Sequence, residues 1–268
     1  MDFALNEIQQ ELKSQARSWL AERYPLDRDW DGPEDHRWAE IAELGWLDVA
    51  EADLGFVEEA LLLEEMGYAL YPGPYLAHVG GGGQIELKGF VYGGEDGGDL
   101  VQSVYPSRPL RRSTSTNGAG ETPRVRAAMA AEAVGIAQRV LELGIEHAKT
   151  RMQFGKPIGI YQAVSHQLTN TYTDVELARS LVYWAAWCVA EEDEQAPVAA
   201  AAAKAFATEA AVTACERSIQ VHGGTGFTWE HPLHRFYKRA LWLEGLGSRP
   251  SELRGEVADA VLGVTVPV

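Results

Sequence analysis

The first part of the chain shows the hydrophobic periodicity of helices. Apolar side chains recur every three or four positions, as at Ile8, Leu12 and Ala16, and a proline or glycine ends each run. The helices that this pattern predicts span 6–24, 33–45 and 56–70. We therefore expect residues 1–73 to form a small N-terminal helical domain.

The pattern changes between residues 74 and 122. This stretch contains four consecutive glycines from Gly80, three prolines and a run of serine and threonine over 113–116. Only two short stretches, 84–92 and 100–104, have the composition of strands. A β domain needs more strands than this, so we expect a truncated middle segment, a linker with one or two hairpins.

From residue 123 onward the pattern is helical again. Long amphipathic helices joined by short connections favour antiparallel neighbours in a bundle. The alanine-rich run over 199–203 consists of strong helix formers and lets neighbouring helices approach closely. The helices expected here span 124–150, 162–192, 197–220, 232–246 and 250–262. The prediction is a mainly α fold, with a C-terminal four-helix-bundle domain over 123–268 and a much reduced middle β segment.

Composition limits the classes of function. A chain of 268 residues with 46% hydrophobic residues can build a sizeable core. Its formal net charge of -16 repels nucleic acid and anionic membranes, so we expect no nucleic-acid partner. An anionic ligand would have to be held by a local basic group, since the overall field opposes it.

Several features favour a cytoplasmic protein. We expect no membrane span, because the sequence has no uninterrupted apolar run of 18 residues. The first residues lack the basic and apolar regions of a secretory signal. The two cysteines, Cys188 and Cys215, lie in apolar helical patterns, which is typical of buried free thiols in a reducing compartment.

The connection after the first bundle helix carries residues that are not simple turn formers. Arg151 offers a planar fork of donors that suits a phosphate, and Phe154 offers a flat apolar face. Gly155 and Gly159 allow tight turns. Gln162 opens the next helix, where unpaired backbone N–H groups favour an anion. An ordinary helix–helix loop with a surface arginine is the alternative interpretation.

A second unusual connection follows the alanine-rich helix. Gly223, Gly224 and Gly226 come directly after Gln220 and His222. Glycines at a helix end permit positive φ and let a ligand approach the backbone closely. Such a loop can accept a pyrophosphate or the edge of a nucleotide. A glycine-rich helix C-cap without a ligand is the alternative, and the pairing of this loop with the first segment strengthens the ligand interpretation.

Together the two segments resemble the C-terminal half of the acyl-CoA dehydrogenases. The resemblance covers roughly 123–247 and extends more weakly to 1–73, which looks like the N-terminal helical domain of that family. The matching positions are Arg151, Phe154, Gly155, Pro157, Ile158, Gly159 and Gln162 in the first segment, and Gln220, His222, Gly223, Gly224, Gly226, Phe227, Glu230 and Pro232 in the second.

The resemblance implies FAD as the cofactor, bound at subunit boundaries. In this family the first motif binds the FAD pyrophosphate of one subunit, and the second reaches the FAD of a neighbouring subunit. The implied cofactor-binding residues are Arg151, Phe154 and Gln162 for one flavin, and Gln220, Gly223 and Gly224 for a flavin bound mainly by the partner. These residues suit a dinucleotide, because it needs hydrogen-bond donors for its phosphates, a flat surface for a ring and a loop whose backbone it can approach.

The chain departs from the family at the catalytic position. Family members remove the α-proton of the substrate with a glutamate, which must be positioned and desolvated. The two positions for this glutamate fall on Gly247 and Val125, and neither can accept a proton. Glu244, one helical turn before Gly247, is the candidate for a relocated base. Glu132 and Glu142 are further carboxylates on the first bundle helix, and the sequence leaves the catalytic residue unassigned.

The short middle segment is the second departure, because the family has a β domain there that covers the flavin ring. A chain with flavin motifs, no base and little β domain resembles the short subunit of the heterotetrameric (α2β2) acyl-CoA dehydrogenases of bacterial steroid catabolism. The resemblance then implies a larger dehydrogenase subunit as partner, a bulky acyl-CoA as substrate and electron-transfer flavoprotein as electron acceptor. By family analogy, this chain contributes FAD half-sites to an oxidoreductase and is not catalytic alone.

Three alternatives stay open at this point. The chain could be a self-sufficient homo-oligomeric dehydrogenase that uses Glu244 as its base. It could also be a structural or binding protein on this fold that has lost FAD. A metal site is conceivable around His231 and His234, which are three residues apart, with His222 and Glu230 nearby. Because a proline between the two histidines marks a helix start, we predict no metal.

Overall fold

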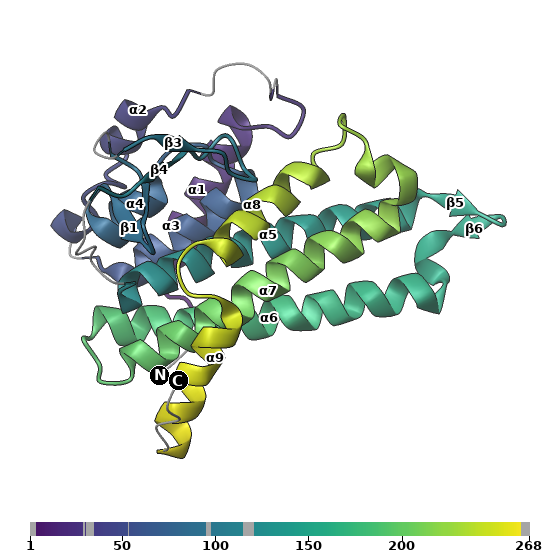
Figure 1. Cartoon of the computed structure of the whole chain (residues 1–268). Coiled ribbons are helices and arrows are strands. Elements are labelled where there is room, and N and C mark those ends of the chain that lie inside the picture. The colour runs from purple at the N-terminus through teal and green to yellow at the C-terminus, as the bar shows by residue number, and fades with distance from the viewer. Residues whose placement is uncertain are drawn as a thin grey trace.

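The computed structural model describes residues 4–28, 30, 35–52, 54–94, 98–114 and 121–263. Helices make up most of this part of the chain, and one small sheet lies at one side of them (Figure 1). The fold is mainly α, as the hydrophobic pattern predicts. Most buried apolar residues, from Ala16 to Leu246, belong to one continuous core cluster.

The N-terminal helices follow the predicted order. Asn6 caps the first helix through a capping box with Gln9, which satisfies two backbone groups that the helix leaves unpaired. The second helix is shorter than predicted and begins at Trp38. The helices of this region are α1 (Glu7–Arg23), α2 (Trp38–Glu43), η1 (Val49–Ala52), α3 (Phe56–Ala69) and α4 (Tyr75–Gly81).

Glycines allow α3 to pack tightly against the first bundle helix, α5 (Pro123–Thr150). A Cβ atom at Gly67 would overlap the backbone of Glu132, and one at Gly135 would overlap the backbone of Glu64. Close approach of two helix backbones is a common reason for glycine inside a helix, where it otherwise costs stability. The N-terminal helices and the bundle therefore share an interface without side-chain spacers at these two points.

The middle segment contains two hairpins, β1–β2 and β3–β4, as the sequence predicts, and pairing of β2 with β4 joins them into one sheet. Four short strands form an antiparallel sheet in the order β1-β2-β4-β3, and helix α4 precedes them. Part of the predicted run of serine and threonine, residues 115 and 116, lies outside the described residues. The strands are β1 (Ile85–Leu87), β2 (Phe90–Tyr92), β3 (Leu100–Val101) and β4 (Leu110–Arg112).

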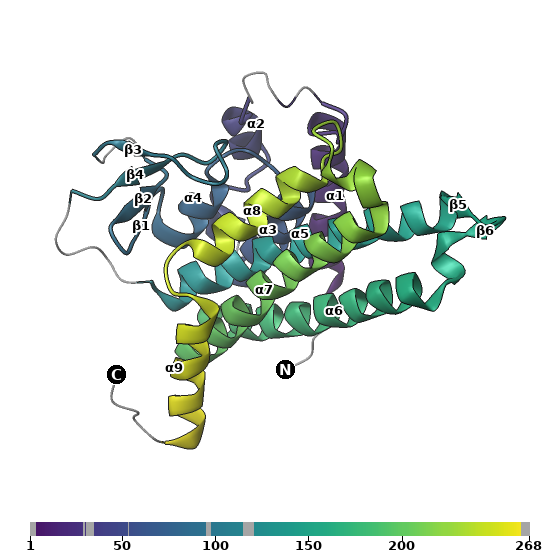
Figure 2. The same ribbon diagram turned by 45° about the vertical axis from the view of Figure 1, so that its right-hand side comes forward.

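The C-terminal helices match the predicted ranges within two residues at each end. Helix α7 packs against α5, α6, α8 and α9, and its small alanine side chains leave room for these neighbours. At one end of the bundle a short hairpin projects beyond the helices (Figure 2). The remaining elements are β5 (Met152–Gln153), β6 (Lys156–Pro157), η2 (Ile158–Ile160), α6 (Gln162–Ala190), α7 (Ala196–His222), η3 (Gly223–Phe227), α8 (Leu233–Gly245) and α9 (Pro250–Leu262).

One helix is long and apolar enough to cross a membrane by length and composition. It spans Ala196–Phe227, and 67% of its most apolar window is buried inside the protein. That burial is what a core helix needs, since its apolar residues already face other helices. Cys188 and Cys215 are both buried free thiols, as the sequence pattern predicts.

A buried ion triad connects the middle segment to two bundle helices. Glu132 of α5 accepts hydrogen bonds from Arg108 (2.8 Å) and from Arg239 of α8 (2.8 Å from Nε). All three side chains are at most 1% exposed. Burial alone would raise the pKa of the Glu132 carboxyl, but the two guanidinium groups outweigh burial and hold that pKa below its usual range. The carboxylate is therefore ionised and structural.

Candidate functional site

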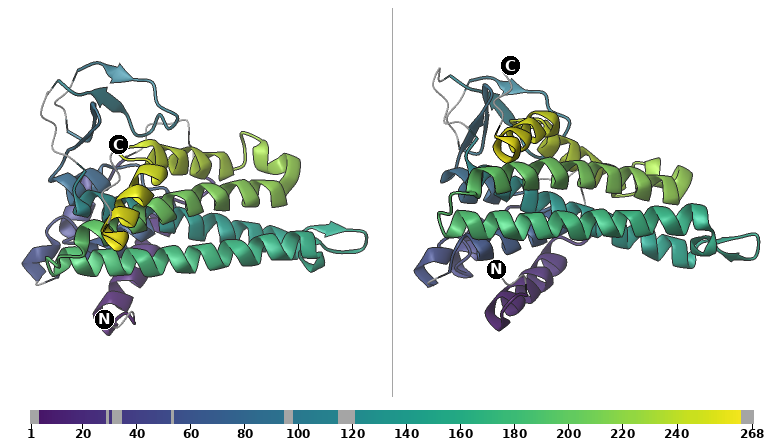
Figure 3. Two further views of the ribbon diagram at one scale, coloured as in Figure 1. Left: turned by 60° about the horizontal axis from the view of Figure 1, so that its bottom comes forward. Right: turned by 90° about the horizontal axis from the view of Figure 1, so that it is seen from below.

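The two unusual connections meet at one end of the bundle. The hairpin β5–β6 and the turn η2 connect α5 to α6, and the turn η3 follows the end of α7 beside them (Figure 3). The helix ends from which the two connections start are in contact, because the rings of His147 in α5 and His222 in α7 stack with their centroids 4.2 Å apart. The segments that the sequence pairs on motif grounds are thus neighbours in space.

Arg151 ends α5, and its guanidinium faces solvent. Its backbone N–H donates to the carbonyl of His147 at 2.8 Å, which fixes the residue at the last turn of the helix. The side chain is exposed, and it forms no hydrogen bond or ion pair with any residue that the structure describes. An arginine held at its backbone and free at its fork can still donate to an external anion.

The tip of the hairpin presents an aromatic ring. Phe154 and Gly155 both have positive φ, 50° and 75°, and they form the turn between β5 and β6. Phe154 is 91% exposed, with Tyr161 edge-on at 6.3 Å between ring centroids. A non-glycine residue at positive φ is strained. Since nothing in the core uses this ring, it is available to a ligand or to another subunit.

The glycine-rich loop contains glycines with different physical roles. Gly223 needs positive φ (62°), and a Cβ atom at Gly226 would lie 2.9 Å from His222 and from the Ile219 carbonyl, so the fold itself requires both glycines. Gly224 has no positive φ, and a Cβ atom there would meet nothing within 4 Å. The fold does not explain the glycine at 224, and open space in front of it leaves the backbone accessible.

Two glutamines flank this end of the bundle. Gln162 is the first residue of α6, and Gln220 lies in the last turn of α7; both are exposed. Backbone N–H groups in the first turn of α6 lack helical partners, as at any helix start. All six residues predicted to bind a cofactor therefore belong to exposed parts of the two connections.

Large apolar side chains are also exposed here. Soluble proteins rarely leave several large apolar residues uncovered in one region unless a partner or ligand covers them. The exposed residues in the two connections are Met152, Phe154, Ile160, Phe227 and Trp229. This end of the bundle therefore has the character of a binding surface.

A cluster of histidines underlies the surface. His222 is 8% exposed and lies between His147 (centroids 4.2 Å apart) and His231 (4.6 Å apart). Burial and the neighbouring imidazoles lower the pKa of His231 to about 4, and burial also lowers the pKa values of His147 and His222. At neutral pH all three rings are uncharged. The sequence places His222 near His231 only as part of a conceivable metal site, and it gives no sign that His147 packs against His222.

The described residues contain no group of three or more histidine, cysteine or acidic side chains arranged to hold a metal ion. His231 packs against His222, whereas His234 of α8 stacks on Trp229 with 4.5 Å between centroids. Aromatic contacts thus account for both histidines of the conceivable metal pair.

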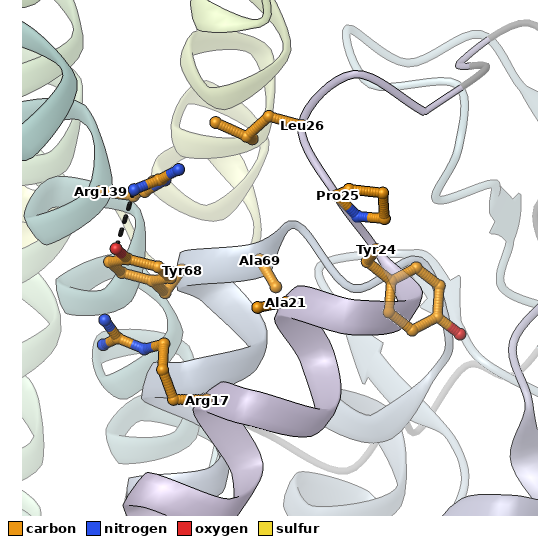
Figure 4. A pocket seen from close by; sticks show the side chains of 8 residues that line it. All are labelled: Arg17, Ala21, Tyr24, Pro25, Leu26, Tyr68, Ala69 and Arg139. Atoms are coloured by element: carbon orange, nitrogen blue, oxygen red, sulfur yellow. Dashed lines mark hydrogen bonds between the residues drawn. The ribbon is translucent and has the colours of Figure 1, made fainter.

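A cavity of about 250 Å³ lies on the side of the molecule formed by α1, α3 and α5 (Figure 4). Arg17 and Arg139 flank the ring of Tyr68 from opposite sides, with Cζ atoms 3.4 and 4.9 Å from the ring centroid. Arg17 also pairs with Glu65, and Arg139 donates to the Tyr68 hydroxyl at 2.9 Å. The cavity contains none of the residues that the sequence predicts for the site.

The position of the missing glutamate faces another carboxylate. Gly247 has positive φ (77°), and a Cβ atom there would meet the carboxyl group of Glu121. Glu121 is almost fully buried, pairs with the ammonium of Lys204 and accepts from the Ser248 N–H at 3.0 Å. Burial opposes its ionisation, but these partners hold its pKa below the usual range. Glu121 is therefore a structural anion, and a carboxylate with a lowered pKa is a weak base.

Glu244 and Glu142, the other carboxylates considered as a base, differ in their surroundings. Glu244 is half-buried on α8, and burial together with Glu209 and Glu216 raises its pKa. Glu142 accepts a hydrogen bond from the hydroxyl of Tyr68. Val125 is a buried apolar residue in the first turn of α5.

Comparison with known proteins agrees with this geometry. Residues 121–247 match the family model for the acyl-CoA dehydrogenase C-terminal domain, and this range includes both connections. Residues 121–247 are therefore similar to the acyl-CoA dehydrogenase C-terminal domain, and the resemblance that the two motifs predict is confirmed.

Individual relatives and structures extend the comparison. The acyl-CoA dehydrogenase IpdE2 of Mycobacterium tuberculosis is 38% identical over 161 residues, 57% of this chain and 48% of that protein. The probable acyl-CoA dehydrogenase YngJ of Bacillus subtilis is 40% identical over 131 residues, 48% of this chain and 33% of that protein. The chain thus spans less than half the length of these relatives.

Solved structures share the fold over nearly the whole chain. The ChsE4-ChsE5 complex from Mycobacterium tuberculosis superposes with a TM-score of 0.77, at 20% identity, over 99% of this chain and 100% of the matched chain. The Tcur3481-Tcur3483 steroid ACAD variant gives 0.75, at 22% identity, over 96% and 98%. At these identities the likeness establishes the fold.

Proposed function

We propose that this chain is a subunit of an FAD-dependent acyl-CoA dehydrogenase and that it contributes half-sites for the flavin. One observation carries the proposal: the Arg151 segment and the glycine-rich loop are adjacent, exposed and rich in groups that the fold itself does not use. The family comparison supports the same reaction class, α,β-desaturation of an acyl-CoA thioester.

The residues present suit FAD. Arg151 would donate its fork to the pyrophosphate, because its guanidinium has no partner among the described residues. Phe154 would cover a ring system, and Gln162 would donate from the start of α6. Gln220 and the open backbone at Gly224 would contact a second flavin, held mainly by a neighbouring subunit. When bound, FAD accepts the hydride that leaves the β-carbon of the substrate.

Neither of the two positions that the family uses for its catalytic glutamate holds a carboxylate in this sequence, which supports a heteromeric assembly. Glycine and valine occupy the two family positions of the catalytic glutamate, and the nearby Glu121 is held by Lys204. We therefore infer that a larger subunit supplies the glutamate and the β domain, as in an α2β2 enzyme. We further infer a cytoplasmic location, a bulky acyl-CoA substrate such as a steroid derivative, and electron-transfer flavoprotein as acceptor. Two structural neighbours, the ChsE4-ChsE5 complex and the Tcur3481-Tcur3483 steroid ACAD, support this inference.

Co-expression with the product of the adjacent gene tests the proposal. We expect the purified complex to contain FAD in a fixed ratio to this chain, to bleach on addition of an acyl-CoA, and to lose both properties when this chain is omitted. A full complement of FAD and turnover by the chain alone would refute the half-site proposal and favour a self-sufficient dehydrogenase.

Replacing Arg151 by alanine is expected to weaken FAD binding to the complex by about 10- to 100-fold, because charge-assisted hydrogen bonds contribute roughly 1.5–3 kcal/mol. Fluorescence of released flavin measures the dissociation constant. Lys149→Ala is the matched control: Lys149 is exposed two residues earlier and has the same charge. We expect less than about a threefold change for it. If the two variants lowered FAD affinity equally, Arg151 would act only through its positive charge and not through hydrogen bonds to the pyrophosphate.

A further inference from the structure

Three imidazole rings from three different segments pack together beneath the proposed flavin surface. His147 lies in the last turn of α5, His222 ends α7, and His231 lies in the connection before α8. The His147 and His222 rings stack at 4.2 Å with 27° between their planes. The His222 and His231 rings meet at 4.6 Å and 60°. The stack is thus the contact that joins all three segments.

Two of the three histidines, His147 and His222, lie at the ends of the helices from which the two connections start. The carbonyl of His147 accepts the backbone N–H of Arg151 at 2.8 Å, and His222 directly precedes Gly223. A shift of one ring against the other would therefore move the Arg151 fork relative to the open loop. Catalytic and binding groups lose much of their effect when displaced by about 1 Å.

Hydrogen bonds define the proton on Nδ1 of two of the rings, and the one at His231 indicates a neutral ring. Nδ1 of His222 lies 2.8 Å from the carbonyl oxygen of Ser218, so this nitrogen carries the proton and donates. Nδ1 of His231 accepts the backbone N–H of Leu233 at 3.3 Å, so this nitrogen carries a lone pair. Neutral imidazoles stack like other aromatic rings, whereas two imidazolium rings at this distance repel each other.

The charged surroundings do not favour a protonated stack. The groups that act electrostatically on His147 are His222 and Arg151, and those that act on His231 are His222, His147 and His234. No carboxylate is among these groups. A protonated ring would therefore be partly buried, with only imidazoles and one guanidinium around it and no negative charge to stabilise it.

We propose that the His147–His222–His231 stack is a positioning clamp that sets the spacing between the Arg151 segment and the glycine-rich loop, and that it holds only while the rings are neutral. The clamp is a property of this chain, and its effect on flavin rests on the function proposed above. The three histidines act through Arg151 and the loop backbone, so they are positioning residues.

The pH dependence has a definite sign. Burial lowers the pKa of each ring below its value in the open state, so the folded clamp binds fewer protons than the open one. The clamp stabilises the closed arrangement fully above about pH 6.5, which is the ordinary pKa of histidine. This stabilisation declines as the pH falls below 6.5 and is lost by about pH 4, the pKa of His231.

Variants of His147 in the full-length chain test the clamp without flavin. His147→Ala removes the stacked ring, whereas His147→Phe keeps an aromatic ring that cannot take a proton. We expect amide hydrogen exchange at pH 7.5 in 151–158 and 223–227 to be about tenfold faster in His147→Ala and close to wild type in His147→Phe. Unchanged exchange in His147→Ala would overturn the clamp, and circular dichroism checks that both variants fold.

Flavin release from the co-expressed complex provides the pH profile. For the wild type we expect the dissociation constant of FAD to rise about tenfold between pH 7.5 and 5.5, and for His147→Phe only about threefold. Equal slopes in the two proteins would contradict the requirement for neutral rings.

The two proposals can fail separately. If Arg151→Ala leaves the flavin content unchanged, the half-site function is wrong, while the exchange experiment still tests the clamp. If Arg151→Ala releases flavin but both His147 variants match the wild type at every pH, the clamp alone is wrong.

Discussion

Glu132→Gln is expected to lower the free energy of unfolding by about 3–5 kcal/mol, because it leaves two buried guanidinium groups without a counter-charge. Arg108 and Arg239 cannot lose their protons to escape this penalty. Glutamine has nearly the same volume as glutamate, so the loss reports charge and not a cavity. In a chain of this size the change corresponds to a fall in melting temperature of roughly 6–20 °C.

Thermal or urea unfolding of the purified chain measures this effect. Glu146→Gln is the matched control, since Glu146 lies on the same helix with an exposed side chain and forms no ion pair with the described residues. We expect that variant to stay within about 0.5 kcal/mol of the wild type. A loss below about 1 kcal/mol in Glu132→Gln would mean that water reaches the triad and screens the two arginines.

Gly224→Leu is expected to reduce FAD affinity of the assembled complex by more than about 100-fold while leaving the chain folded. A Cβ atom at this position meets nothing within 4 Å, so the leucine side chain extends into the open space before the loop. That space is where the proposed function puts the dinucleotide. The affinity should therefore fall because a side chain occupies the approach to the backbone, with no change in core packing.

The control is Gly255→Leu on α9, where an added Cβ atom also meets nothing within 4 Å. We expect normal flavin content in that variant. The free energy of unfolding, measured on the chain alone, should change by less than about 1 kcal/mol in either variant. Retention of FAD by Gly224→Leu would place the dinucleotide elsewhere.

Much of the architecture could be predicted from the sequence because the bundle helices are long. The hydrophobic periodicity repeats over many turns in α5, α6 and α7, which makes it easy to recognise, and prolines or glycines mark the ends of these helices. The sequence predicts the hairpins of the middle segment but not their pairing into one sheet, because the strands have two or three residues each. The sequence Leu110–Arg112 of β4 contains no alternating apolar pattern, so only pairing with β2 and β3 makes it a strand.

The candidate site divides in the same way. Arg151 and Gly224 could be found from the sequence, since a donor fork and a run of glycines are unusual residue choices for helix connections. The histidine stack and the Glu121–Lys204 pair could not, because their members lie far apart along the chain. A histidine or glutamate shows no local pattern that tells whether it will be buried beside a partner.

The sequence by itself determined the helices, the two connections and the glycine at 247, because each depends on residue type and local spacing. Tertiary structure alone decided that the helix ends before the two connections touch, that Gly247 faces Glu121, and that Glu132 pairs with two arginines. The physical reason is that burial and long-range contact set the charge state and partners of an ionisable group, and both arise only when distant helices pack together.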